Sequence, residues 1–136
     1  MAYPRLMTAK AVYDFGIDEG AVSTITPANG GVVPNNAIIT KAYSVVTTAM
    51  AGSGATLALA VGGVAIVAAT AFDNGIYDDE DVTEYDVADK TTSSGQPTFT
   101  VGSAVLTAGV VELYIQYYIT AESVSAQSTF FKILSN

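Results

Sequence analysis

The sequence predicts an all-β protein, and two observations lead to that class. Half of the residues are hydrophobic, but much of that half is Ala and Val, and Gly, Thr and Ser fill most of the gaps. β-Branched residues pack well on a pleated surface, and Gly marks turns. In several segments hydrophobic residues also recur at a period of two, the spacing of a half-buried strand. With 136 residues, the chain suits one domain with a sizeable core.

The first third of the chain predicts three strands. Residues 9–15 ("AKAVYDF") and 21–26 ("AVSTIT") are short β-rich segments, and the glycines of "GIDEG" between them indicate a turn. Residues 27–36 ("PANGGVVPNN") concentrate Pro, Gly and Asn and therefore predict a break. Helix and strand compete for residues 37–50 ("AIITKAYSVVTTAM"), where the Ile, Val and Thr content favours strand.

Residues 56–70 predict a hairpin. In "TLALAV" the larger side chains Leu57, Leu59 and Val61 fall on one face, and alanines fall on the other. Gly62 and Gly63 tolerate the positive φ angles of a two-residue turn, after which "VAIVAAT" returns as a second strand.

The same region contains the one membrane-span candidate. The interval between Lys41 and Asp73 carries no charge and is long enough to cross a bilayer. It consists mostly of Ala, Gly, Thr and Val, however, and its alternation is better explained by two strands. We therefore expect no membrane partner.

The last third predicts an extended run in "TTSSGQPTFTVG" and the clearest strand of the chain in residues 104–120. This strand alternates strictly, which predicts one face against the core and one partly polar face. The expected core residues are Val111, Leu113, Ile115, Tyr117 and Ile119, and the expected outer residues are Glu112, Tyr114, Gln116 and Tyr118.

About eight strands with closely spaced turn signals predict a single β-sandwich or jelly-roll-like domain with short terminal arms. We expect an N-terminal arm over residues 1–10, the sandwich over 11–120, and a C-terminal arm or last strand over 121–136. Apolar side chains at both ends must be buried, either on this chain's sheet or on a neighbouring chain. The resulting interface candidates are Tyr3, Leu6, Met7, Phe130, Phe131, Ile133 and Leu134.

An acidic segment, "IYDDEDVTEYDVADK" at residues 76–90, holds seven carboxylates. We expect it to lie in an exposed acidic loop spanning about 73–96, with a short strand in which Val82, Tyr85 and Val87 pack. Crowded carboxylates also suit calcium, and an irregular site would use Asp78, Asp79 and Asp81. The spacing does not match an EF-hand loop: counted from Asp73 the third and fifth residues are Gly75 and Tyr77, and counted from Asp79 the twelfth is Lys90, where Glu is needed.

The composition excludes several classes of function. With neither Cys nor His, the chain lacks thiolate nucleophiles, zinc-thiolate sites and the commonest general base. A net charge of −8 with only five Lys and Arg residues argues against nucleic acid as a partner. Paired carboxylates hydrolyse glycosides, but adjacent exposed acids lack the apolar pocket that raises one pKa into the working range. We expect no enzymatic activity and no cofactor, with calcium as the alternative above.

Four successive segments carry a resemblance to a known class of proteins. They are "AVYDFGIDEGAVSTI", "NAIITKAYSVVTTAM", "GSGATLALAVGG" and "TFTVGSAVLTAGVVELYIQYYI". Together they resemble small structural proteins of tailed-bacteriophage virions, of the capsid decoration, cement or head-fibre type. The resemblance extends from about Ala11 to Thr120 and contains no catalytic signature. The acidic segment and the residues after Thr120 depart from the pattern.

The resemblance implies a small β-sandwich that is made in the host cytoplasm and binds the exterior of the virion capsid. It implies the major capsid protein as partner, association as a homotrimer, and a mechanical role in stabilising the shell. The terminal segments are then natural grips on the capsid or on a neighbouring protomer. The alternative is a receptor- or carbohydrate-binding module of a phage fibre, which a β-sandwich with exposed tyrosines would also suit.

Overall fold

A computed structural model describes residues 5–71 and 81–119 of the chain. Within these residues eight strands form two four-stranded sheets, and the prediction of an all-β sandwich is confirmed. The elements are β1 (Arg5–Asp14), α1 (Phe15–Asp18), β2 (Thr24–Ile25), β3 (Ile38–Ala51), β4 (Thr56–Val61), β5 (Val64–Ala71), β6 (Val82–Lys90), β7 (Thr98–Gly102) and β8 (Ala108–Ile119).

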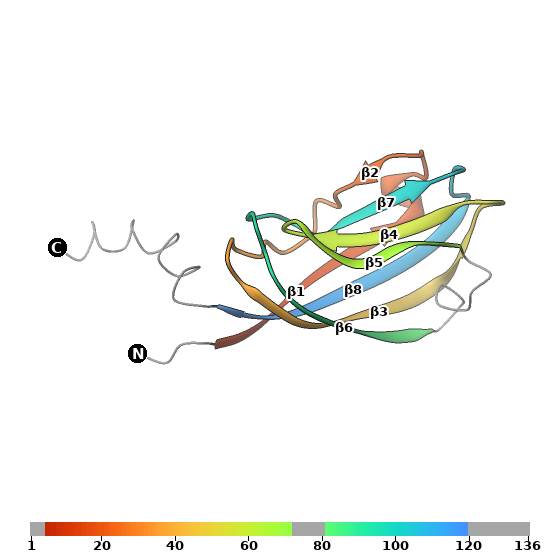
Figure 1. Cartoon of the computed structure of the whole chain (residues 1–136). Coiled ribbons are helices and arrows are strands. Elements are labelled where there is room, and N and C mark those ends of the chain that lie inside the picture. The colour runs from red at the N-terminus through yellow and green to blue at the C-terminus, as the bar shows by residue number, and fades with distance from the viewer. Residues whose placement is uncertain (1–4, 72–80, 120–136) are drawn as a thin grey trace.

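The two sheets lie face to face (Figure 1). Sheet A has the strand order β1-β8-β3-β6, and sheet B has the order β2-β7-β4-β5. Within them β1 pairs with β8, β2 with β7, β3 with β6 and β4 with β5, always antiparallel. The four strands of the first half of the chain therefore pair with the four strands of the second half in reverse order, like one long hairpin. The β4–β5 turn is the closed end of this hairpin.

The core lies between the sheets and is built from alternate side chains. In β4 Leu57, Leu59 and Val61 are buried, as the alternation predicts. In β8 the buried side chains are Val111, Leu113, Ile115 and Tyr117, so this prediction is also confirmed, while Ile119 is only partly buried.

The predicted two-glycine hairpin is confirmed. Gly62 and Gly63 have φ angles of 56° and 85°, and Val61 pairs with Val64 across the turn. Strands β3, β4 and β5 occupy the uncharged interval that was the membrane-span candidate. No helix within residues 5–71 and 81–119 is long and apolar enough to cross a membrane.

Three expectations near the N-terminus need correction. The segment "GIDEG" is mostly the short helix α1, because the Asp14 carboxylate caps it by accepting a hydrogen bond from the Gly16 N–H at 2.9 Å. The strand expected over residues 21–26 is reduced to β2, since β7 pairs with only Thr24 and Ile25. Residues 5–10 are not an arm, because β1 starts at Arg5 and its unbroken register with β8 carries them into sheet A.

The acidic segment is also not a loop throughout. Val82–Lys90 forms β6, which pairs with β3 along the edge of sheet A. Tyr85 and Val87 pack against the core as expected, but Val82 is 67% exposed. Val82 and Tyr85 are three residues apart, so a strand places them on opposite faces. The rest of the acidic segment, up to residue 80, lies outside the described residues.

Candidate binding surface

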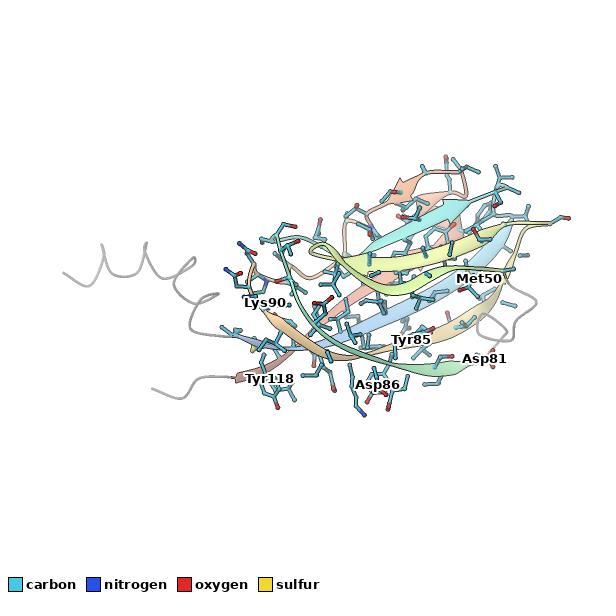
Figure 2. All side chains as sticks on the ribbon, in the orientation of Figure 1. Met50, Asp81, Tyr85, Asp86, Lys90 and Tyr118 are labelled. Atoms are coloured by element: carbon cyan, nitrogen blue, oxygen red, sulfur yellow. The ribbon has the colours of Figure 1, made fainter. Side chains whose placement is uncertain are left out.

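The outer face of sheet A is the surface turned away from sheet B. Successive side chains of a strand alternate between the two faces, and the strand register aligns the outward ones in rows. Read across sheet A in the order β1, β8, β3, β6, the rows are Val12-Glu112-Val45-Val82, Lys10-Tyr114-Tyr43-Glu84, Thr8-Gln116-Lys41-Asp86 and Leu6-Tyr118-Ile38-Lys90. Figure 2 shows Asp86 and Tyr118 pointing to this side.

Lys10, Glu112 and Tyr114 form one polar cluster on this face. The Lys10 ammonium lies 3.6 Å from a Glu112 carboxylate oxygen and 5.2 Å from the centre of the Tyr114 ring. The Tyr114 hydroxyl donates a 2.6 Å hydrogen bond to the same carboxylate. Contact with Tyr114 and the charge of Glu112 raise the pKa of Lys10, so this lysine stays charged. These contacts hold the side chains of Lys10, on the edge strand β1, and Tyr114, on β8, against each other.

Lys41, on the inner strand β3, forms ion pairs with two acids of the edge strand β6. Its ammonium lies 3.0 Å from Glu84 and 3.8 Å from Asp86, and these contacts raise the pKa of Lys41. The Asp86 side chain is 83% exposed. Exposed pairs of this kind contribute little to stability, so they serve mainly to balance charge on a flat surface.

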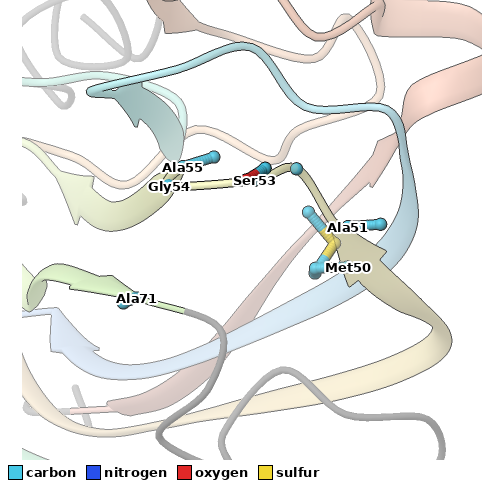
Figure 3. Close-up of a pocket in the computed structure, with 7 residues that line it drawn as sticks. Met50, Ala51, Ser53, Gly54, Ala55 and Ala71 are labelled. Atoms are coloured by element: carbon cyan, nitrogen blue, oxygen red, sulfur yellow. The ribbon is translucent and has the colours of Figure 1, made fainter.

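A hollow of about 370 Å³ lies beside the β3–β4 connection, near the end of β5 (Figure 3). Met50, Ser53, Gly54 and Ala71 contribute to its lining, and none of the described residues that line it has a titratable side chain. General acid-base chemistry needs a titratable group within hydrogen-bonding distance of the substrate, and the described lining offers none.

The proposed calcium ligands are only partly visible. Asp81 is partly buried, and its carbonyl accepts a 2.9 Å hydrogen bond from the Val46 N–H. Asp78 and Asp79 lie outside the described residues. In the part of the chain that the structure describes, no three His, Cys, Asp or Glu side chains gather where they would hold a metal ion. The calcium alternative stays a prediction.

Two of the interface candidates are described. Leu6 is 52% exposed on the outer face of sheet A, whereas Met7 points to the other face and packs against the core. Tyr3, Phe130, Phe131, Ile133 and Leu134 lie outside the described residues.

The structure also brings Tyr118 and Ile38 beside Leu6 in one row. Ile38 is 41% exposed, and it was missed because the interface candidates were taken only from the two ends of the chain. A register shift between Ile39 and Lys41 interrupts the alternation of β3 and places both Ile39 and Ala42 in the core, so no regular period of two marks the exposed side of this strand.

Comparisons with known proteins give a likeness of fold. No protein-family model matches the chain, and no curated protein matches its sequence. Among solved structures, a chain of the "Cyanophage Pam1 capsid asymmetric unit" is similar with a TM-score of 0.62 and 14% identity, over 87% of this chain and 88% of that chain.

Two further structures are similar. One is the "Acidic stable capsid structure of Helicobacter pylori bacteriophage KHP30", with a TM-score of 0.54, 15% identity, and coverage of 83% of this chain and 86% of that chain. The other is the "Capsid of Ralstonia phage GP4", with a TM-score of 0.50, 17% identity, and 85% of each chain covered. At these identities the shared property is the β-sandwich fold.

Proposed function

We propose that this protein is a non-enzymatic structural protein of a phage virion. In this proposal it binds the outer surface of the capsid as a decoration or cement protein, contacts the major capsid protein, and stabilises the shell. The role is mechanical, so affinity and geometry matter and no reacting group is needed.

The observation that carries the proposal is the coverage of the fold likeness. The similarity to the chain from the Pam1 capsid asymmetric unit extends over 87% of this chain and 88% of that one. The likeness therefore covers nearly the whole fold of both chains and does not depend on one short motif. Fold alone does not determine function, so the inference is an analogy that the following features support.

The strand order supports a jelly-roll arrangement. The pairs β1–β8, β2–β7, β3–β6 and β4–β5 are those of an eight-stranded ribbon wrapped into two sheets. Jelly rolls recur in viral capsid proteins and in lectins. In this proposal the outer face of sheet A is the surface that meets the partner.

The distribution of polar groups supports a role without catalysis. Glu84, Asp86 and Glu112 lie on the open outer face of sheet A, and each of them contacts a lysine. The described lining of the hollow has no titratable side chain. Within the described residues, these acids and the hollow are therefore in different places.

Attachment as a homotrimer is part of the proposal. Specific interfaces bury about 1,200–2,000 Å² in total, and apolar terminal segments extend what a small domain covers. A trimer that engages three shell subunits makes its second and third contacts intramolecular, so modest single affinities add up to durable attachment. The proposed grips are the apolar residues near the two ends of the chain, of which Leu6 is exposed.

The test uses purified full-length protein and capsid shells that lack it. We expect the protein to sediment with the shells to saturation in a sucrose gradient, and to raise the temperature at which the shells break. Without shells, light scattering is expected to give three times the chain mass of 14.0 kDa. Protein that stays at the top of the gradient at micromolar concentration contradicts the capsid role, and a monomer mass contradicts only the trimer.

A fibre module that binds a receptor or a carbohydrate is the second candidate, and one observation favours it. Tyr43 and Tyr114 are cross-strand neighbours on the outer face, and aromatic side chains with polar tips suit carbohydrate binding. Lys10 already lies over the Tyr114 ring, which leaves less of this pair for a sugar. Binding on a glycan array that is lost in Tyr43→Ala, together with no sedimentation with shells, would replace the first proposal with this one.

A further inference from the structure

The edges of the two sheets differ in how they are protected. An edge strand exposes unpaired N–H and C=O groups that pair readily with another strand. In the described residues the edge strands are β1 and β6 in sheet A, and β2 and β5 in sheet B. β6 carries exposed acids, the register of β5 with β4 shifts twice, and β2 has only two residues. Charges, bulges and short length are the usual devices that stop edge pairing.

The second half of the β1 edge is closed by a loop. The Val12 N–H donates to the Asn29 side-chain oxygen at 2.7 Å, and the Asn29 side-chain nitrogen donates to the Val12 C=O at 3.0 Å. The Gly31 N–H donates to the Lys10 C=O at 3.0 Å. The Asn29 side chain thus makes the two hydrogen bonds that a neighbouring strand would make. Because Val12 and Lys10 are the residues that bond to this loop, the even-numbered residues of β1 are those whose backbone groups point away from β8.

The first half of the β1 edge is open. By the same alternation, the outward backbone groups are the N–H of Lys10 and both groups of Thr8 and Leu6. No neighbouring strand pairs with them in the described part of the chain, where the only partner of β1 is β8. The register of β1 is unbroken from Arg5 to Asp14, so this open stretch is regular.

The apolar side chains at this end of sheet A are only partly buried. Met7 and Ile119 lie against the core but are only partly buried, and Leu6 on the other face is 52% exposed. The start of β1 and the end of β8 project beyond sheet B (Figure 1). Both the backbone and the apolar side chains here therefore fit an added strand.

We propose that residues 128–134 ("STFFKIL") of the C-terminal segment add to sheet A as a fifth strand beside the open edge of β1. Ile119, the last described residue, pairs with Arg5, so the rest of the chain leaves sheet A next to this edge. At about 3.3 Å per residue, residues 120–127 span up to about 26 Å. Crossing β1 to its free side takes two strand spacings, about 10 Å, so the segment of the same copy reaches the edge.

The sequence of the segment has the composition of such a strand. In an extended chain Phe131 and Ile133 fall on one face, and Phe130 and Leu134 fall on the other. One apolar pair then covers Met7 at the margin of the core, while the second pair extends the outer face. The inference concerns the folding of this chain alone and stands whether or not the protein binds a capsid.

The test is residue-resolved amide hydrogen exchange, followed by NMR, on the full chain. We expect the N–H groups of Leu6 and Thr8 to exchange within about tenfold of those of Met7 and Ala9, which face β8. Without an added strand they exchange far faster than these neighbours. The N–H of Val12 serves as an internal standard, because Asn29 protects it in every variant.

Two strand-breaking variants locate the partner. Consecutive N–H groups of a strand point to opposite sides, so either Lys132→Pro or Ile133→Pro removes a donor to β1. We expect at least one of them to speed exchange at Leu6 and Thr8 by tenfold or more. Ser125→Pro, in the connection, is the matched control and is expected to change neither.

Three results overturn the proposal. The first is fast exchange at Leu6 and Thr8 in the unmodified chain. The second is protection that survives both Lys132→Pro and Ile133→Pro. The third is protection that falls on dilution, which assigns the open edge to a second copy instead.

Discussion

Gly109, near the start of β8, is a position where one added methyl group should be costly. Its φ is +134°, and it lies against Met50 of β3, where the β3–β8 register shifts. A Cβ atom at this position would lie 2.9 Å from the Met50 Cα and would collide with the Met50 sulfur. The sulfur is able to move by rotation of the side chain, but the Cα moves only with the strand.

The expected cost of Gly109→Ala follows from these two effects. A non-glycine residue held at such a φ costs about 1–3 kcal/mol. Inserting a methyl group into a packed site costs about another 1–3 kcal/mol. The free energy of unfolding should therefore fall by about 2–6 kcal/mol. At about 3 °C per kcal/mol for a chain of this size, the melting temperature should fall by about 6–18 °C.

Two other glycines separate the two effects. Gly54 has φ +78° with no atom within 4 Å of an added Cβ, so Gly54→Ala measures backbone strain alone, about 1–2 kcal/mol. An added Cβ at Gly95 meets neither obstacle, so Gly95→Ala should stay within about 0.5 kcal/mol of the parent. The measurement is urea unfolding followed by circular dichroism. If Gly109→Ala and Gly54→Ala differ by less than about 1 kcal/mol, the packing argument is refuted.

Four shorter predictions concern other parts of the molecule. Asn29→Ala should lower the free energy of unfolding by about 1–2 kcal/mol, because it removes two hydrogen bonds to β1; an unchanged urea midpoint would contradict this. Burial and, to a lesser extent, nearby acids raise the pKa of Tyr13 to about 12, so the stability that its neutral form contributes is complete below pH 10 and lost between pH 10 and 12. Tyr13→Phe should flatten the fall of the urea midpoint over that range, and an equal slope in both proteins would refute the assignment. Lys41→Met should shift the melting temperature by no more than about 3 °C at low salt and by nothing measurable in 1 M NaCl, and a large shift that survives salt would contradict the view of exposed pairs. Removing divalent ions with EDTA should leave the melting temperature unchanged, and a rise on adding Ca²⁺ would instead support the calcium alternative.

Local patterns predicted the strands whose two faces differ most. The alternation of β8 identified its core residues correctly, because one face of this strand is buried along most of its length. The hairpin at Gly62 and Gly63 was equally clear, since few residue pairs accept two positive φ angles in succession. Both signals depend only on neighbouring residues.

The acidic segment shows where local patterns fail. Its charge suggested an exposed loop with only a short strand, yet the whole of Val82–Lys90 forms β6, because β3 offers a partner edge and Tyr85 packs against the core. The Tyr85 hydroxyl lies 2.8 Å from the Ser44 hydroxyl, and Ser44 is fully buried. This polar pair satisfies two hydroxyl groups inside the sandwich, and it joins residues on different strands. No pattern within either strand indicates that they meet.

The residues of the candidate surface were predicted only in part. Leu6 was selected as an interface residue from its position near a terminus, and it is exposed. Ile38 and Tyr118 stand beside it only because β1, β8 and β3 are adjacent in sheet A. Strand order depends on long-range pairing, which a single sequence does not encode in any short window.

The sequence by itself determined the chemistry that is absent and the β character of the chain. It contains no imidazole and no thiol, few cations, and strands whose alternation requires a two-layered core. The tertiary structure alone decided which edges are protected and which stay open. Asn29 closes the edge at Val12 across a sequence separation of 17 residues, while the backbone at Thr8 is left without such a neighbour in the described residues. Every residue except proline has the same backbone hydrogen-bonding groups, so the arrangement of strands determines where such groups are left without a partner.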